Sequence, residues 1–310
     1  MTETKTKYCG ADISKEWIDI WSQGRVERIA NTARAVRAFL KKLPVGTLVA
    51  MEATNDYHLL LADIATELGL TAYVLNPRIT HHYQEALALR GTTDALAART
   101  IASFIQHHHP DVRVYVPADP QTKQVRTLLR RRSKLVDVCV QLRQSVSQIS
   151  SIRKEVEVAI AKLGKAIEKI DTLVDEMMQG NELRERLQTM RGIGPVTSAV
   201  IATELEAHDF ATSDAFVAFC GLDPRPKESG KHKGKRKLSK RGSRSLRTCL
   251  FLAAMSASST KLWRPYYEKT KAKGLAKLQA ILVLARKLAR IAWSIQRHNT
   301  VFDPARVPTA

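Results

Sequence analysis

Three closely spaced runs near the start of the chain constrain its fold most. YCGADI, WIDIWS and RVERIA are rich in β-branched and aromatic residues and are separated only by short polar turns, which predicts a three-strand meander. Further along, TLVAMEA is apolar as in a buried central strand, and TAYVLNP predicts another strand. Helical patterns lie between and after these runs, so we predict a mixed α/β layer fold over about residues 5–108.

Local signals set the expected helix boundaries of this region. Asn31 is expected to cap a helix that continues to about Lys41. Apolar residues at helical spacing predict a helix that continues to Leu68 and is ended by Gly69. Pro77 is expected to end the strand TAYVLNP. A last helix is predicted over about residues 93–107.

Residues 121–190 carry no strand signal. Apolar residues recur every three or four positions from Leu128 to Val156, which predicts one long amphipathic helix, and a second helix is predicted from about Lys165 to Met178. Such a helical arm is compatible with pairing between two copies and with a hairpin inside one chain, and periodicity does not separate the two.

Residues 188–299 are predicted to be helical with loops. The run GIGP precedes a helix with Pro195 near its first turn, and LAKLQAILVLARKLARIAWSIQR predicts a strongly basic amphipathic helix. The tail VFDPARVPTA is expected to fray. Trp263 and Trp293 could stack on nucleic-acid bases, although a place in the core is the favoured reading.

The charge of the chain indicates a polyanionic partner. A formal net charge of +20 over 310 residues, with a pI near 10.0, favours nucleic acid over a membrane surface. No apolar run has the length of a spanning helix, and the polar N-terminus excludes a signal peptide. The four cysteines are scattered, which indicates neither disulfides nor a zinc site. We therefore expect a cytoplasmic protein with no membrane partner.

Three carboxylates are candidates for a metal site. Asp12 ends the first predicted strand, Glu52 ends the fourth, and Asp94 lies near the start of a helix. If the first and fourth strands lie side by side, Asp12 and Glu52 converge, and a hard cation such as Mg²⁺ prefers such oxygen ligands. The alternatives are that Asp94 caps its helix and that Glu52 pairs with an arginine.

A dense basic run follows Ser229. From Lys231 to Arg247 the chain has nine Lys or Arg and no acid, which favours phosphate contacts over a solvated face. Gly192 and Gly194 in the GIGP turn could bring backbone N–H groups to a phosphate, although a plain helix entry fits equally well. The candidate nucleic-acid-binding side chains are Lys227, Lys231, Lys233, Lys235, Arg236, Lys237, Lys240, Arg241, Arg244 and Arg247.

The sequence also contains three consecutive histidines, His107 to His109. A metal site there is disfavoured, because consecutive residues on a helix do not share a face and Pro110 is expected to end the helix.

Taken in order, the motifs resemble a known family. G-A-Asp12, Glu52 followed by A-T, Asn76-Pro77 and T-Asp94-A-L-x-A-R form one series, and GIGPVTSAV, GLDPRPKESG and LSKRGSRSLR form another. The chain resembles the insertion-sequence transposases with a DEDD motif, which include pilin-gene inverting recombinases and bridge-RNA-guided recombinases. The resemblance covers roughly residues 7–300.

This resemblance implies an architecture and a chemistry. It implies a RuvC-like domain with an RNase H fold over residues 1–115, a coiled-coil dimerisation arm over 116–185 and a mostly α-helical transposase domain over 186–310. The implied reaction joins Ser229 covalently to DNA while an acidic tetrad that begins with Asp12, Glu52 and Asp94 holds Mg²⁺. The implied partners are donor and target DNA, a structured noncoding guide RNA and further copies of the chain, as a dimer or a tetramer.

One position departs from the family pattern. A second aspartate is expected three residues after Asp94, where this chain has Ala97. Residues at this spacing share a helix face, so the change removes one ligand without moving the other. Either Ala97 is a deliberate inactivating substitution, which the intact flanking TDAL and AAR favour, or it is a natural variant with three carboxylates.

A serine hydroxyl needs activation before it attacks a phosphodiester. His232 is a candidate base, but Mg²⁺ on the acidic cluster is the more economical activator. Two alternatives remain. The chain could be a junction-resolving, metal-dependent nuclease that uses water as nucleophile, or a catalytically silent nucleic-acid-binding protein.

Overall fold

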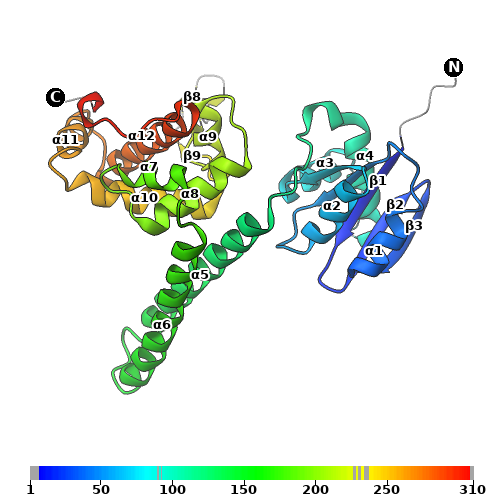
Figure 1. Ribbon diagram of the computed structural model, residues 1–310, viewed down its shortest axis with the longest axis horizontal. Coiled ribbons are helices and arrows are strands. Elements are labelled where there is room, and N and C mark those ends of the chain that lie inside the picture. The colour runs from blue at the N-terminus through cyan, green and yellow to red at the C-terminus, as the bar shows by residue number, and fades with distance from the viewer. Residues whose placement is uncertain are drawn as a thin grey trace. The chain divides into compact units, whose positions relative to one another are not determined.

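The computed structural model describes residues 7–88, 91, 93–225, 228–229, 232–233 and 237–307, with the backbone alone for residues 228, 229, 232, 233 and 237. Contacts within the chain divide it into two compact units, Met1–Pro117 and Ala118–Ala310 (Figure 1). Each unit has its own buried core.

The N-terminal unit is built on a five-strand mixed sheet of order β3-β2-β1-β4-β5. β1 (Tyr8–Ile13), β2 (Trp17–Ser22) and β3 (Arg25–Ala30) form an antiparallel meander. β4 (Leu48–Glu52) and β5 (Thr71–Leu75) extend the sheet beyond β1 in parallel. The predicted meander and the buried strand TLVAMEA are therefore confirmed.

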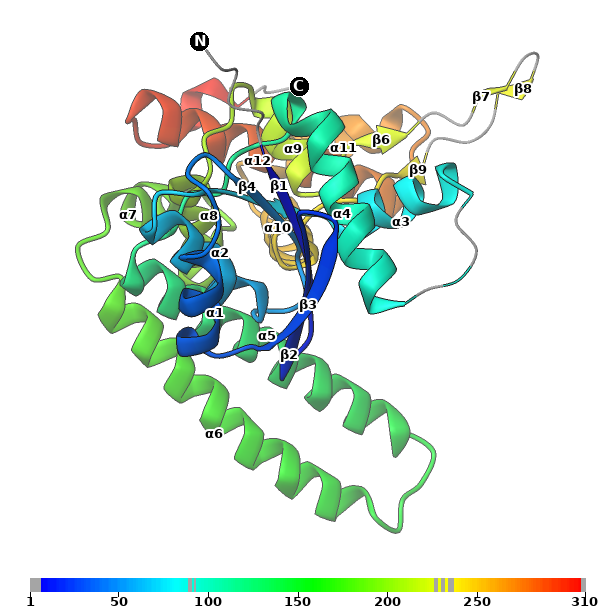
Figure 2. The ribbon, with the colours of Figure 1, turned by 90° about the vertical axis from the view of Figure 1, so that its right-hand side faces the viewer.

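Helices cover both faces of this sheet (Figure 2). α1 (Ala33–Leu40) and α2 (His58–Glu67) pack on the face that carries Cys9, Ala11 and Met51. On the opposite face, α4 (Asp94–His108) packs Ile101 and Ile105 against apolar residues of β4 and β5. Side chains alternate along a strand, so Gly10 and Asp12 both lie on the α4 face.

Two boundaries of this unit differ from the prediction. Thr32, and not Asn31, caps α1, because its hydroxyl accepts a hydrogen bond from Ala35 N (3.4 Å). The dipeptide Asn76-Pro77 closes β5 but also begins an unpredicted helix, α3 (Pro77–Ala86). Asn76 Oδ1 accepts from Arg78 N (3.0 Å), and the fixed φ of proline suits the first helical position.

The arm is a hairpin of two helices, α5 (Pro120–Ser145) and α6 (Arg153–Met177) (Figure 1). Ion pairs between Arg143 and Glu157 and between Arg132 and Asp171 show that the two helices run antiparallel. The prediction of one helix through Val156 was wrong. The chain turns over residues 146–152, where serines weaken the helix, and the apolar spacing continues across that turn. The second helix likewise begins before Lys165.

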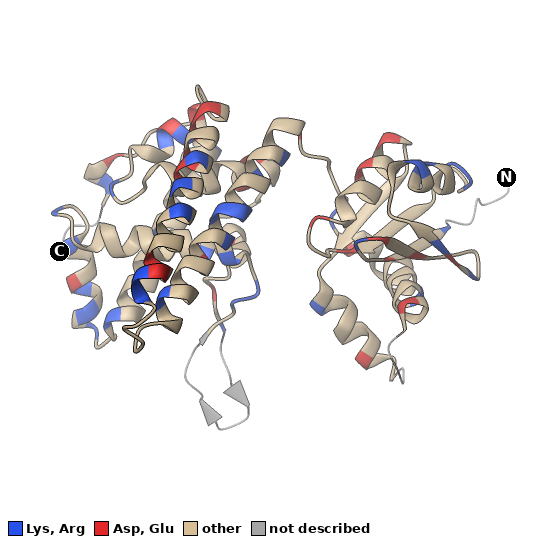
Figure 3. Cartoon of the chain, turned by 90° about the horizontal axis from the view of Figure 1, so that it is seen from below, with Lys and Arg blue, Asp and Glu red and all other residues tan. Residues whose placement is uncertain are grey.

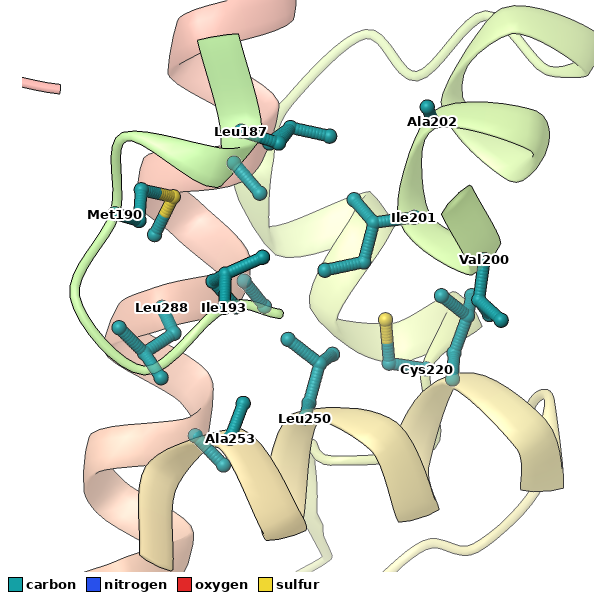
Figure 4. Packing of buried hydrophobic residues seen from close by; sticks show 14 of the residues in the cluster. Leu187, Met190, Ile193, Val200, Ile201, Ala202, Cys220, Leu250, Ala253 and Leu288 are labelled. Carbon is teal, nitrogen blue, oxygen red and sulfur yellow. The ribbon is translucent and has the colours of Figure 1, made fainter. Parts of the chain in front are cut away.

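In the rest of the C-terminal unit, six helices surround one core within the part of the chain that the structure describes. Leu187, Ile201, Leu250 and Leu288 come from four of these helices and are fully buried (Figure 4). This confirms the prediction that the region is helical with loops. The helices are α7 (Glu182–Gln188), α8 (Pro195–Ala207), α9 (Ser213–Phe219), α10 (Arg244–Ser258), α11 (Arg264–Ala272) and α12 (Lys277–His298).

The chain after α12 packs against this core. Phe302 and Val307 are buried, and the Phe302 ring stacks on Trp263 with ring centroids 5.9 Å apart. The expectation that this segment frays was wrong for residues 301–307, because its two apolar side chains enter the core. Trp263 is fully buried and Trp293 is half-buried with Nε1 bonded to Phe210 O (2.9 Å), so both tryptophans are structural, as favoured.

Candidate functional site

A row of charged residues crosses one face of the N-terminal sheet. In the antiparallel ladders Asp12 lies opposite Asp19, and Asp19 lies opposite Arg28. In the parallel ladder Ala11 is beside Met51, so Asp12 and Glu52 follow at the carboxyl ends of two adjacent strands. The topology therefore brings two of the three predicted carboxylates together on the face that α4 covers.

Asp94 joins this row from the first turn of α4. Thr93 caps the helix, since its hydroxyl accepts from Leu96 N (3.2 Å). The alternative in which Asp94 serves as the cap is therefore wrong. The Asp94 carboxylate instead accepts a hydrogen bond from Arg28 Nη2 (2.9 Å).

Gly10 lets α4 approach the sheet closely. A Cβ atom at this position would lie 2.2 Å from Ala98 O and 2.4 Å from Ala102 N, both atoms of the α4 backbone. The helix could not keep this position over any larger residue. Gly10 thus sets how near the first turn of α4 comes to the end of β1.

The carboxylates interact electrostatically. Burial, together with the charges of Asp94 and Glu52, raises the pKa of Asp12 to about 6. Glu52 is half-buried and accepts a hydrogen bond from Thr80 Oγ1 (2.8 Å), a side chain only 5% exposed. Glu52 is thus bonded to a hydroxyl among the described residues, and not to an arginine as the alternative prediction had it.

Two members of the row were not predicted from the sequence. Asp19 is 8% exposed, and Arg28 donates hydrogen bonds to its carboxylate from Nε (3.0 Å) and Nη2 (2.8 Å). The same guanidinium reaches Asp94, so Arg28 links β2 to α4. The available signal was the meander itself, because its register places IDIW opposite GADI and thus Asp19 opposite Asp12.

Ala97 lies one turn after Asp94 on α4 and is half-buried. Its neighbour Ala98 is fully buried against β1. A carboxylate at position 97 would thus be carried on the turn of α4 that is nearest the row of acids.

The two ends of the segment that carries Ser229 are joined by a strand pair and a hydrogen bond, and we call this junction the base of the segment. β6 (Pro224–Arg225) pairs with β9 (Lys237–Leu238), and Ser239 Oγ donates a hydrogen bond to the Asp223 carboxylate. Between them β7 (Glu228–Ser229) pairs with β8 (His232–Lys233), with Ser229 directly opposite His232 in the register. Lys227, Lys231, Lys235 and Arg236 lie outside the described residues, and of Lys233 and Lys237 only the backbone is described.

Gly242 and Arg247 complete this base. A Cβ atom at Gly242 would lie 2.0 Å from Phe219 O, so the close approach of two chain segments requires glycine here. Arg247 is half-buried and Nη1 donates to Cys220 O and Gly242 O (3.4 Å each). Arg244 pairs with Asp137 (3.3 Å), whereas Lys240 and Arg241 are exposed.

Comparison with known proteins decides the family. Residues 9–150 match a DEDD transposase model of the IS110 type, and residues 184–268 match the model described as "Transposase IS116/IS110/IS902 family". The chain belongs to this transposase family. Both halves of the motif series fall inside the matched ranges.

Individual relatives cover most of the transposase. A probable family 20 transposase of Pseudomonas aeruginosa is 26% identical over 95% of this chain and 98% of its own length. The IS900 42 kDa protein of Mycobacterium paratuberculosis is 25% identical over 97% of this chain and 68% of its own. The pilin gene-inverting protein of Moraxella bovis is 24% identical over 82% and 81%.

The GIGP turn of the transposase has a packing role at its first glycine. Gly192 has a φ of +102°, and a Cβ atom there would lie 2.7 Å from Ala257 Cβ of α10. Gly194 is the N-cap of α8 and has open space where a Cβ would be. Of the two predicted glycines, only Gly194 leaves room for a ligand atom.

In the described part of the transposase, the residues with metal-ligand spacing are not the consecutive histidines His107 to His109. Among the described residues, the group with metal-ligand spacing is His81, His82 and Glu85 on α3, where His82 Nδ1 lies 3.0 Å from Glu85 Oε2. All three side chains are exposed. Within the same part of the chain, no helix is both long and apolar enough to cross a membrane.

Proposed function

We propose that this transposase cuts and rejoins DNA through a covalent bond between Ser229 and a DNA phosphate, with Mg²⁺ bound by Asp12, Glu52 and Asp94. The observation that carries the proposal is the convergence of these three carboxylates on one sheet face in a chain of this family. In this proposal the N-terminal unit has the RNase H-like (RuvC-like) fold, to which the order of its mixed sheet is suited.

The residues present fit a hard divalent cation. Three carboxylates offer only oxygen donors. Burial and the neighbouring acids raise the pKa of Asp12, and a cation among the carboxylates would offset their mutual repulsion. When bound, Mg²⁺ supplies charge stabilisation at the phosphate. Thr80 orients Glu52, whereas Arg28 pairs with Asp94 and would have to give way to the cation.

The covalent step is a transesterification. Ser229 Oγ forms a bond to phosphorus, the bond between phosphorus and a deoxyribose oxygen breaks, and the serine proton passes to a base while the leaving oxygen gains one. His232 is the candidate base, because it lies directly opposite Ser229 in the β7–β8 register. The energy of the phosphodiester is kept in the new bond, as strand exchange requires.

Further partners follow from the family resemblance. We propose a structured noncoding RNA as the guide for target and donor DNA, supported by the net charge of +20. We also propose a homo-oligomer formed through the arm at about residues 116–185, between domains at 1–115 and 186–310. The exposed apolar side chains Val140 and Val158 on α5 and α6 support this role. Sequencing the nucleic acid that co-purifies with the protein tests the guide, since a mixture of unrelated cellular RNAs would oppose it.

A second candidate function is that of a catalytically silent nucleic-acid-binding protein, which Ala97 favours. The test is to incubate Ala97→Asp with donor DNA, RNA and Mg²⁺ and to look for a protein–DNA adduct that survives denaturation. We expect an adduct that disappears in Ala97→Asp/Ser229→Ala and when Mg²⁺ is omitted. Cleavage without an adduct would indicate a nuclease that uses water, and no cleavage at all would favour the silent protein.

A further inference from the structure

Helix α12 carries three arginines on one stripe. Arg286, Arg290 and Arg297 are four and seven residues apart, so they recur on nearly the same side of the helix. Trp293 shares this stripe and donates from Nε1 to Phe210 O (2.9 Å). The stripe therefore faces the segment that leads into α9.

Acids on the facing segment neutralise two of the three arginines. Arg290 pairs with Asp214 through Nη2 (2.8 Å) and Nε (2.9 Å), and Arg297 lies 3.9 Å from Asp209. Within the described residues Arg286 has no ion pair, and its Nε is buried without a hydrogen-bond partner. The stripe thus has three guanidinium groups, whereas two acids of the facing segment pair with it.

Arg286 carries its charge in an unfavourable place. Its side chain is half-buried, and burial together with the charge of Arg290 lowers the pKa of its guanidinium. The attraction of Asp214, Tyr266 and Asp223 offsets this only in part. This poorly solvated charge destabilises the free protein, and an external anion bound at the Nη groups, which are not among the buried unpartnered atoms, would compensate it.

The position of Arg286 relates it to the Ser229 segment. Arg297 pairs with Asp209 and Arg290 with Asp214, so α12 runs antiparallel to this segment and Arg286 lies toward the end that leads to Asp223. Asp223 immediately precedes β6 and accepts a hydrogen bond from Ser239 after β9. The Asp223 carboxylate is thus engaged at the base of that segment. Lys and Arg are spread over the helices of the C-terminal unit, which suits contact with a polyanionic strand (Figure 3).

We propose that Arg286, assisted by Arg290, forms a phosphate-binding site beside the base of the Ser229 segment, and that its ligand is a phosphodiester group of bound DNA. A guanidinium presents paired N–H donors that match two phosphate oxygens. Arg290 can contribute to the same phosphate, because Asp214 engages Nε and Nη2 and leaves Nη1 without a hydrogen bond among the described residues. The site rests on the proposed function in taking DNA as the partner, but not on covalent attack by Ser229.

The test measures equilibrium binding of the full chain to a short DNA duplex of arbitrary sequence over a range of salt concentrations. We expect Arg286→Gln to weaken binding about tenfold at moderate salt and to reduce the slope of log affinity against log salt by about one phosphate contact. The matched control is Arg297→Gln, which makes the same charge change on the same helix at an arginine with an acid partner. It should change the affinity about twofold or less.

A second measurement shows that the variant is folded. Because Arg286→Gln removes a poorly solvated charge, its unfolding midpoint without DNA should equal or exceed that of the wild type. An unchanged salt slope, or a loss no larger than in Arg297→Gln, would overturn the site. Loss confined to an RNA duplex of the same length would also overturn it. Binding does not require cleavage, so a missing Ser229 adduct overturns the covalent chemistry and leaves this site standing.

Discussion

Arg28 Nη2 lies 2.9 Å from Asp94 Oδ2, and the same guanidinium binds Asp19. Arg28 thereby joins the edge strand β3 to the first turn of α4 through Asp94, one of the proposed metal ligands. A cation bound to Asp94 must compete with this guanidinium. Arg28 therefore acts as a built-in counter-ion of the acidic row.

We predict that Arg28→Gln tightens Mg²⁺ binding. Without the guanidinium, Asp94 is free to turn toward a cation, so the half-saturating Mg²⁺ concentration should fall about two- to fivefold, the range expected for an exposed ion pair. Titration of the unfolding midpoint with Mg²⁺ measures it. Arg25→Gln on the same strand is the control, since no ion pair of Arg25 is found among the described residues. Equal Mg²⁺ responses in the two variants would contradict the prediction.

The raised pKa of Asp12 predicts a pH-dependent stability. The folded pKa of about 6 exceeds the ordinary value of 3.8, so the folded state binds the proton more tightly and loses stability as pH rises through 6. Without metal, Asp12→Asn should equal the wild type at about pH 4 and be about 1–2 kcal/mol more stable at about pH 8, a value reduced for the partial exposure of Asp12. Denaturant unfolding in chelator measures the difference. A gap that is constant with pH would refute the assignment.

The close approach at Gly10 predicts that Gly10→Ala destabilises the N-terminal unit. The added methyl group would meet the α4 backbone, which cannot rotate away as a side chain can, and we expect a loss of about 3 kcal/mol. Gly164→Ala is the control, because Gly164 is inside α6 with open space around it. That variant should gain about 0.5–1 kcal/mol. Urea unfolding of both variants tests the pair, and a neutral Gly10→Ala would mean that α4 lies further from β1.

The packed tail predicts a large effect at Phe302. Phe302→Ala removes the ring that stacks on Trp263 and should destabilise the C-terminal unit by about 3 kcal/mol. The adjacent Val301 is 61% exposed, so Val301→Ala should stay within about 0.5 kcal/mol. Similar unfolding midpoints for the two variants would indicate that the tail frays after all.

The sequence was sufficient to predict elements with strong periodicity. The meander, β4 and α12 follow directly from side-chain alternation or helical spacing, and Asp12 and Glu52 follow from the strands that they end. The break between α5 and α6 was hidden because apolar spacing continues through the turn at 146–152. Asn76-Pro77 was ambiguous, since the same dipeptide ends a strand and starts a helix.

Tertiary contacts account for what was missed at the site. Asp19 and Arg28 look like alternating polar residues on exposed strands, and only the ladder register brings them beside Asp12. Arg247 looked like part of a phosphate-binding run, but its guanidinium donates to two backbone carbonyls of its own chain. Charge density along a sequence does not reveal which basic side chains are already hydrogen-bonded within the fold.

Because Thr93 supplies the helix cap, the Asp94 carboxylate is not needed for α4 to form. Alanine at position 97 is moreover the residue with the highest helix propensity, and it adds no negative charge to a crowded face. A copy of this gene that loses such an acid would still yield a folded protein. A change of this kind at α4 would therefore leave a folded chain in the cell rather than a misfolded product.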